Sequence, residues 1–165
     1  MIVRERCHRM GESRVGFEPD EIRTAESTRS ARLKWVIVAD DSLPLGRIVN
    51  AAACVAAVTT NAVPGLLAHG GMDRDGSAHP GLPWAGCTVL AADEAKLRQI
   101  RDKAAKHPEI FVADMPTLAQ ETRVYDEYIE QLAEATGLEL RYAAVSVVGP
   151  RKAVDRIVGG LALLR

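Results

Sequence analysis

The feature of this sequence that most limits its fold is an almost unbroken apolar run, KWVIVA, at residues 34–39. A strand with one buried face alternates apolar and polar residues, whereas a strand covered on both faces is apolar throughout. Asp40 and Asp41 close the run. We therefore expect a central strand in the interior of its sheet, with helices packed on both faces.

Beyond this run, the pattern alternates between helix and strand. A turn at 43–46 leads into an alanine-rich helix at 47–60, and Asp93 is placed to cap a helix at 93–106. The other segments are predicted strands at 87–92, 110–113 and 138–148, and predicted helices at 117–135, ended by Gly137, and at 151–158. The sequence therefore predicts an α/β protein, a three-layer α/β/α sandwich with a four-stranded mixed sheet.

Residues 1–17 have no clear periodicity and end in the stretch MGESRVG. We expect a flexible N-terminal leader at 1–17, followed by a single α/β domain at 18–165. A domain of that length can form one ordinary hydrophobic core.

Charge and cysteine usage narrow the class of function. The formal net charge is -1 at pH 7, which gives no global field to attract an anionic polymer, so we do not expect nucleic acid as a partner. The three cysteines contain no CxxC spacing, which indicates a reducing compartment. We find no apolar signal core and no stretch of membrane-spanning length. The chain is predicted to be cytoplasmic and without a membrane partner.

The segment 61–84 is rich in glycine, proline and aspartate and is longer than a routine connection. Asp75-Gly76 within it is a tight-turn signal. The segment also carries several large apolar side chains, with little regular structure expected to bury them: Val63, Leu66, Leu67, Leu82 and Trp84. A contiguous exposed apolar patch usually marks a contact surface, so we predict a homodimer.

Two stretches carry a resemblance to a known fold. Residues 34–57, KWVIVADDSLPLGRIVNAAACVAA, resemble the opening of the type II peptidyl-tRNA hydrolases, where a strand leads through a Leu-x-Met-Gly-Lys-Gly-Lys turn into an Ala-Ala-Gln helix. At the other end, the stretch from Val148-Gly149-Pro150 to the Gly-x-Leu-x-Leu at 159–163 is similar to the closing turn, helix and tail of that fold. The resemblance implies a type II peptidyl-tRNA hydrolase-like fold.

A closer resemblance, over about residues 17–165, is to the bacterial family called domain of unknown function 2000, which is grouped with that fold. It rests on a set of short motifs: Leu43-Pro44-Leu45-Gly46 with Asn50-Ala51-Ala52, Asp75-Gly76 with His79-Pro80-Gly81, Val124-Tyr125 with Tyr128, and Gly149-Pro150-Arg151 with the terminal Leu163-Leu164-Arg165. This resemblance implies a fold and no activity.

The catalytic pattern of the hydrolases is largely missing. Arg47 stands at the first lysine of their turn, the second lysine is lost, and alanines at 53 and 56 stand at their glutamine and histidine. Asp114 matches their aspartate and Thr117 lies near their threonine, but the intervening glycine is absent. Arginine does not replace a lysine neutrally, because its guanidinium resists deprotonation and bonds as a planar fork. The resemblance therefore does not imply hydrolysis of a tRNA ester.

A candidate ligand site follows from the predicted topology. Arg47 and Asn50 begin the helix after the first strand, and such a helix N-terminus favours an anionic group. Asp41 and Asp114 close two strands, so these side chains meet at one end of the sheet if the strands are parallel. His79 would close over them from the long segment. In the alternative interpretation, Asn50 bonds the preceding turn and Arg47 pairs with Asp40 or Asp41.

Other candidates have weaker patterns. His69, Asp73, Asp75 and His79 offer metal ligands in one segment, but their spacing matches no standard motif, so we predict no metal and no cofactor. Tyr125 is expected in the core and Tyr128 at a pocket wall.

Two classes of function remain. The first is a small-molecule or anion-binding module without the hydrolase catalytic set. The alternative is a divergent hydrolase acting on peptidyl-tRNA or a related ester, which requires a contiguous positive face beside the pocket. Whether the protein is an enzyme stays open.

Overall fold

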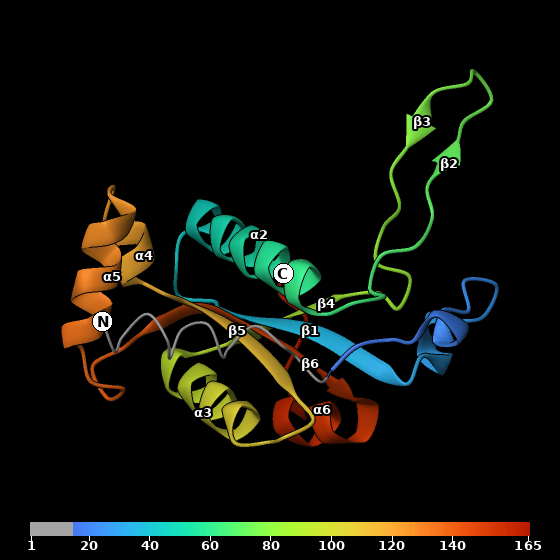
Figure 1. Cartoon of the computed structure of the whole chain (residues 1–165). Coiled ribbons are helices and arrows are strands. Elements are labelled where there is room, and N and C mark those ends of the chain that lie inside the picture. The colour runs from blue at the N-terminus through green and yellow to red at the C-terminus, as the bar shows by residue number, and fades with distance from the viewer. Residues whose placement is uncertain (1–14) are drawn as a thin grey trace, which may run out of the picture.

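In the computed structural model, which describes residues 15–165, the apolar run forms strand β1, Leu33–Asp40. Figure 1 shows β1 inside a four-stranded sheet of order β4-β1-β6-β5, in which β4 is Thr88–Ala92, β5 is Phe111–Pro116 and β6 is Tyr142–Pro150. β1 is parallel to β4 and antiparallel to β6, and β5 is also antiparallel to β6. Val36 and Val38 have 0% exposure. The predicted interior strand and the mixed four-stranded sheet are confirmed.

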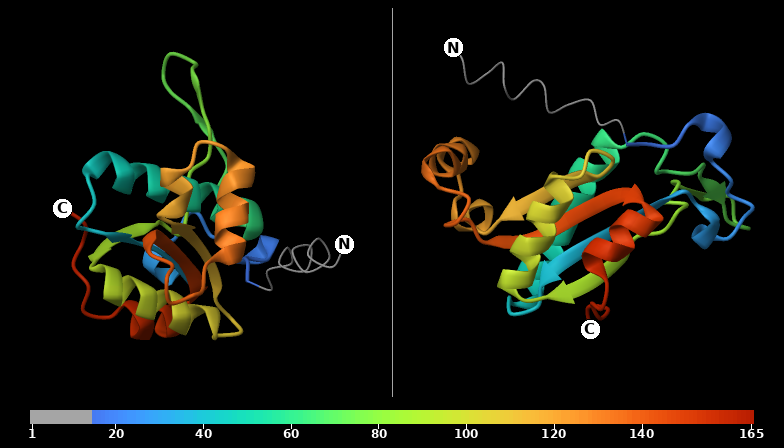
Figure 2. Two further views of the ribbon diagram at one scale, coloured as in Figure 1. Left: turned by 90° about the vertical axis from the view of Figure 1, so that its left-hand side faces the viewer. Right: turned by 90° about the horizontal axis from the view of Figure 1, so that it is seen from below.

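Helices cover both faces of this sheet. Because successive side chains of a strand point to opposite faces, Trp35, Ile37 and Ala39 pack toward helix α2, Leu45–Ala62, while Val36 and Val38 pack in a second cluster. That cluster includes α3, Glu94–Ala105, and α6, Arg151–Val158. Figures 1 and 2 show α2 on one side of the sheet and α3 and α6 on the other. The three layers therefore follow from the unbroken apolar pattern of β1.

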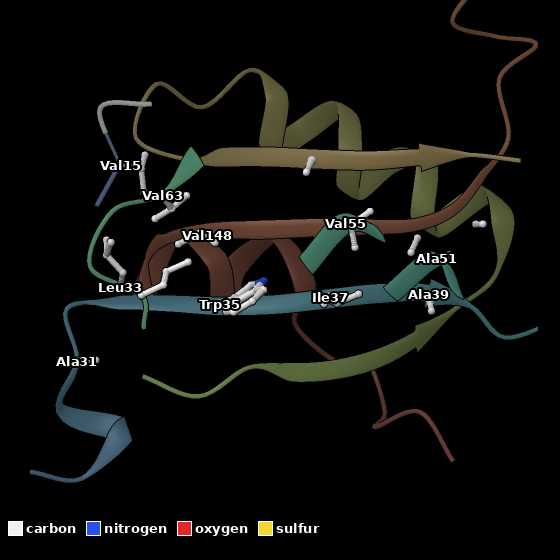
Figure 3. Packing of buried hydrophobic residues seen from close by; sticks show 14 of the residues in the cluster. Val15, Ala31, Leu33, Trp35, Ile37, Ala39, Ala51, Val55, Val63 and Val148 are labelled. Atoms are coloured by element: carbon white, nitrogen blue, oxygen red, sulfur yellow. The ribbon is translucent and has the colours of Figure 1, made fainter. Parts of the chain in front are cut away.

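Helix α2 lies close to the sheet because its buried stripe contains small side chains. Ile48, Ala51, Val55 and Thr59 are buried at helical spacing, and Figure 3 shows Ala51 and Val55 above Ile37 and Ala39 of β1. Thr59 Oγ1 lies 2.7 Å from Ser146 Oγ and donates to the Val55 carbonyl over 2.7 Å.

The indole of Trp35 completes this buried polar chain. Its Nε1 donates to Ser146 Oγ over 2.9 Å. The hydroxyls of Thr59 and Ser146 and the indole N–H therefore satisfy one another between α2 and the sheet, as buried polar groups require.

Helix α3 matches its prediction. The Asp93 side chain caps it by accepting a hydrogen bond from the Lys96 N–H over 2.8 Å. Leu97, Ile100 and Ala104 form its buried stripe.

The predicted continuous helix at 117–135 is wrong, because the structure breaks it into α4, Leu118–Glu121, and α5, Tyr125–Glu134. Thr122 and Val124 adopt extended backbone angles, and the Thr122 hydroxyl donates to the Leu118 carbonyl over 3.0 Å, which ends α4. β-Branched side chains favour extended backbone over helix, and this break contains two of them.

The following strand starts at Tyr142 rather than at residue 138, because Thr136 and Glu139 form a hydrogen-bonded turn before it.

The long segment at 61–84 contains a protruding β-hairpin (Figure 1) of β2, Gly71–Met72, and β3, Ala78–His79. The Asp73 carboxylate accepts hydrogen bonds from the N–H groups of Asp75 and Ser77, both over 2.9 Å. Gly76 has a φ of 86°, which glycine adopts without strain, so the Asp75-Gly76 turn is confirmed.

Much of the apolar content of this segment is buried within the chain itself. Val63 and Leu66 belong to the core, and Trp84 packs against Phe17 with ring centroids 4.8 Å apart. Leu67 and Leu82 remain exposed. The contiguous patch on which we based the homodimer is therefore smaller than expected, and the homodimer stays a prediction.

Packing of the described chain begins before the domain boundary expected from sequence. Val15 and Phe17 are both buried in the α2-side core, so the start of the domain includes them rather than residue 18 onward. The rest of the predicted leader, residues 1–14, lies outside the described residues. Within residues 15–165, no helix combines the length and the hydropathy that a membrane crossing requires.

Candidate functional site

The first turns of α2 are joined to α4 by the side chain of Gln120. Gln120 Oε1 accepts a hydrogen bond from Arg47 Nε over 2.8 Å, and Gln120 Nε2 donates to the Arg47 carbonyl over 2.8 Å and to Asn50 Oδ1 over 3.0 Å. One amide thus fixes both the backbone and the guanidinium of Arg47. The structure brings together two of the predicted site residues, Arg47 and Asn50, through a residue that was not predicted.

Arg47 lies in the wall of an open cavity of ≈ 580 Å³, which we call the polar cavity. It lies between the β1–α2 turn, α4, α5 and the segment before β6, and its lining is Leu43, Arg47, Thr117, Leu118, Glu121, Gln131, Glu134, Ala135, Glu139 and Arg141. Arg47 Nη2 is enclosed, with Glu121 Oε1 3.7 Å away. Arg47 Nη1 makes no hydrogen bond within residues 15–165, and the side chain is 38% exposed. The guanidinium is therefore held on one side and open on the other.

The other charges of the polar cavity are mostly acidic. Two arginines face three glutamates in its lining. Arg141 is already paired with Glu94 over 2.9 Å. Glu139 is ionised at neutral pH, and hydrogen bonds from the N–H and hydroxyl of Thr136 lower the pKa of its carboxyl further. A purely anionic ligand thus meets repulsion over much of this surface.

Asp114 lies on the other side of the sheet from Arg47. It is opposite Val145 in the register of β5 and β6, and its carboxylate accepts a hydrogen bond from Arg101 Nε of α3 over 2.9 Å. The Arg101 guanidinium also lies 5.7 Å from the ring centroid of Tyr142. Asp114 is thus neutralised by an ion pair that the sequence did not predict.

Asp114 does line a second, smaller cavity of ≈ 360 Å³, which we call the apolar pocket. The lining comes from α2, the open edge of β5, α4 and the start of α5: Cys54, Val55, Val58, Asp114, Met115, Pro116, Ala119, Thr122, Arg123, Val124, Tyr125 and Tyr128. Tyr128 stands at this wall as expected, and its burial raises the pKa of its hydroxyl. Tyr125, which we expected in the core, is 74% exposed because α5 is turned away from the sheet.

The remaining predicted residues join neither cavity. Asp41 is exposed, and its backbone N–H donates to the Ala92 carbonyl. His79 lies on the hairpin, where its Nε2 is 3.3 Å from Asp73 Oδ2. Figures 1 and 2 place the hairpin at the opposite end of the molecule from α4 and α5, so His79 does not close over Arg47. The five residues do not form one site.

The structure also does not follow the alternative interpretation, in which Asn50 bonds the preceding turn and Arg47 pairs with Asp40 or Asp41. The Asp40 carboxylate accepts hydrogen bonds from the N–H and hydroxyl of Ser42, and Arg47 bonds Gln120 instead of either aspartate. Asn50 accepts from the Gln120 amide rather than bonding the preceding turn. No group of three or more metal-ligating side chains within residues 15–165 is placed to hold an ion.

Sequence reasoning missed Gln120 and Arg123 as site residues. Gln120 lies 73 residues from Arg47, so no local spacing connects them. Arg123 was placed inside a continuous helix. The signal available was the Thr122-Arg123-Val124 stretch, whose two β-branched residues mark the break.

Comparison with known proteins identifies a family but no activity. A family model described as "Protein of unknown function (DUF2000)" matches residues 33–165. A solved structure of a protein of unknown function, Atu0240, from Agrobacterium tumefaciens is similar with a TM-score of 0.71 and 17% identity, covering 80% of this chain and 97% of that chain. At this identity the likeness shows the fold alone. No curated protein matches the sequence.

Proposed function

Because the chain belongs to the DUF2000 family, whose description records no activity, we propose a function from the chain's own geometry: it is a binding module that holds a small polar molecule by an anionic group. The polar cavity is the site, and Arg47 is the residue that recognises the anionic group. This proposal assigns no reaction. We also propose that the fold is of the type II peptidyl-tRNA hydrolase kind, on the basis of the opening turn and the Gly149-Pro150 turn before α6.

The observation that carries the proposal is the fixation of Arg47 by Gln120. Bonds at the Arg47 Nε and at its carbonyl hold the guanidinium before any ligand arrives, which reduces the entropy lost on binding. The open Nη1 side retains donors that suit a carboxylate or phosphate oxygen. Asn50 acts as a positioning residue, because it bonds Gln120 and does not line the polar cavity.

The acidic surroundings of Arg47 select the rest of the ligand. Glu121 and Glu134 line the same cavity, so a ligand with a neutral or cationic remainder fits better than a polyanion. These acids also favour the small-molecule function over the divergent hydrolase, since a nucleic-acid substrate needs a contiguous positive face.

A ligand screen by thermal shift tests the proposal. Four probes cover the charge types: inorganic phosphate, succinate, glutamate and glucose. We expect glutamate, which carries both charges, to raise the melting temperature more than succinate, and Arg47→Ala to remove that increase. Arg74→Ala is the matched control, because Arg74 is exposed on the hairpin. Equal stabilisation of both variants, or no stabilisation by any probe at millimolar concentration, rejects the polar cavity as the site.

A further inference from the structure

We propose that the apolar pocket is a second binding site, specific for a small amphipathic acid whose aromatic or short alkyl body enters the pocket and whose carboxylate pairs with Arg123. This inference does not rest on the proposed function of the polar cavity, because the two cavities have no lining residue in common.

Exposed apolar side chains are concentrated at the apolar pocket. Val58, Val124 and Tyr125 line it and are 54%, 51% and 74% exposed. Single exposed hydrophobic residues are ordinary, but a group around a concave surface usually marks a binding site. The break at 122–124 adds Val124 and Tyr125 to Val58 of α2 in this group, since it leaves α5 without a single buried residue.

The apolar pocket also has the size of a small-molecule site. The apolar pocket encloses ≈ 360 Å³, which is within the range of about 300 to 1,000 Å³ typical of small-molecule sites. Tyr125 and Tyr128 are in edge-to-face contact with centroids 5.7 Å apart, so an aromatic ring can stack on a preformed wall. Both features favour a compact body over a long lipid chain.

The charged residues of the apolar pocket leave one cation without a partner among the described residues. Asp114 is the anionic residue of the lining, and Arg101 already neutralises it. Arg123 makes no ion pair or side-chain hydrogen bond with any of residues 15–165, so it is the cation of this pocket that still lacks a partner. An acid rather than an amine is therefore the complementary ligand. The Tyr128 hydroxyl is neutral at physiological pH, as a phenol ordinarily is, and burial raises its pKa further, so it adds a hydrogen-bonding group and no repulsion.

Three isosteric probes test the inference: 3-phenylpropionate, 3-phenylpropan-1-ol and 3-phenylpropylamine. Titration of the full chain, followed by NMR, is expected to shift signals of Tyr125, Tyr128 and Cys54 with the acid at millimolar concentration. At low salt the acid is expected to bind up to about fivefold more tightly than the alcohol, the scale of one exposed ion pair. The amine is expected to bind most weakly.

Two variants, each with a matched control, isolate the contacts. Arg123→Gln should reduce acid binding to the level of the alcohol, whereas Arg74→Gln should leave it unchanged. Val58→Glu should bring the affinity for the amine close to that for the acid, because the added carboxylate offsets the charge of Arg123. Val49→Glu should leave the preference for the acid unchanged, because Val49 is 57% exposed on the same helix but lines neither cavity. All four side chains are exposed, so we expect the variants to fold.

Several results would overturn the inference. One is acid binding that Arg123→Gln leaves unchanged, and another is the absence of shifts at the tyrosines. Loss of acid binding in Arg47→Ala but not in Arg123→Gln would place the probe in the polar cavity. Tyrosine signals that broaden with protein concentration in the absence of probe would show that a second copy of the chain covers the pocket.

Discussion

Arg47 Nε donates to Gln120 Oε1 over 2.8 Å and thereby connects the first turn of α2 to the four-residue helix α4. Neither residue is fully buried, and both backbones are held at the same end of the sheet. The contact means that the geometry of the polar cavity depends on a residue that does not line it.

Replacing Gln120 with alanine removes three hydrogen bonds at once. We expect a loss of about 1 to 2 kcal/mol in the free energy of unfolding. The loss is limited because the Arg47 carbonyl, Asn50 Oδ1 and the Arg47 guanidinium remain partly accessible to water. Urea denaturation measures it. Gln131→Ala is the control, because Gln131 lines the cavity without a side-chain hydrogen bond among the described residues, and it should change stability by no more than about 0.5 kcal/mol.

Asn50 is expected to act only through Gln120. In a double-mutant cycle, Asn50→Ala and Gln120→Ala should therefore show a coupling energy of about 0.5 to 1.5 kcal/mol, with Asn50→Ala alone costing about 1 kcal/mol. Strictly additive losses in urea denaturation would show that Asn50 contributes by another route.

The buried hydroxyl of Thr59 is expected to contribute more to the free energy of unfolding than the hydroxyl of Thr60. Thr59→Ala removes the contact with Ser146 and should cost about 1 to 3 kcal/mol. Thr60→Ala is the matched control, because the Thr60 hydroxyl bonds only carbonyls of its own helix, and it should stay within about 0.5 kcal/mol. Similar losses for both variants in thermal or urea denaturation would contradict the role assigned to the polar chain between α2 and the sheet.

Acid should loosen the N-terminal part of the described chain. A hydrogen bond from Arg32 lowers the pKa of Glu21 from 4.5 to about 2. Because the pKa of the folded state is the lower one, the stabilisation is complete above pH 4.5 and is lost as the pH falls from there toward 2. Between these pH values, the free energy of unfolding, measured by denaturation at each pH, should change less with pH for Glu21→Gln than for the parent chain. Identical pH dependence in both chains would show that this carboxylate is not coupled to folding.

The base of the hairpin should not tolerate a side chain at Gly81. A Cβ added there would collide with the Ala68 carbonyl, whereas one added at Gly71 meets nothing within 4 Å. We expect Gly81→Ala to abolish amide-exchange protection of the Ala68 N–H, which bonds the Leu82 carbonyl over 3.0 Å, while Gly71→Ala preserves it. Protection that survives in Gly81→Ala would contradict this prediction, because it would mean that the base of the hairpin accommodates the added Cβ without losing the bond from Ala68 to Leu82.

The layered fold could be predicted because its signals are local. The unbroken run of β1 and the capped stripe of α3 carry their own patterning, and the structure follows both. The break at 122–124 was missed because a strong helical pattern on each side hides a short extended stretch. The position of Tyr125 was then wrong as a consequence.

The candidate site was less predictable because it depends on contacts between distant segments. Strand direction, which the sequence left as a condition, brings the ends of β1 and β5 to the same end of the sheet. Strand direction does not indicate that Asp114 lies on the α3 side, where it forms an ion pair with Arg101. The partners of Arg47 and Asp114 are thus set by register and tertiary packing rather than by residue type.

The small helix α4 has a consequence for the two cavities taken together. Leu118 and Glu121 belong to the wall of one, while Ala119 belongs to the wall of the other, so α4 forms part of the partition between them. A ligand that displaces this partition from one side changes the shape available on the other. By thermodynamic linkage the effect is reciprocal: whatever factor the first compound imposes on the affinity of the second, the second imposes on the first.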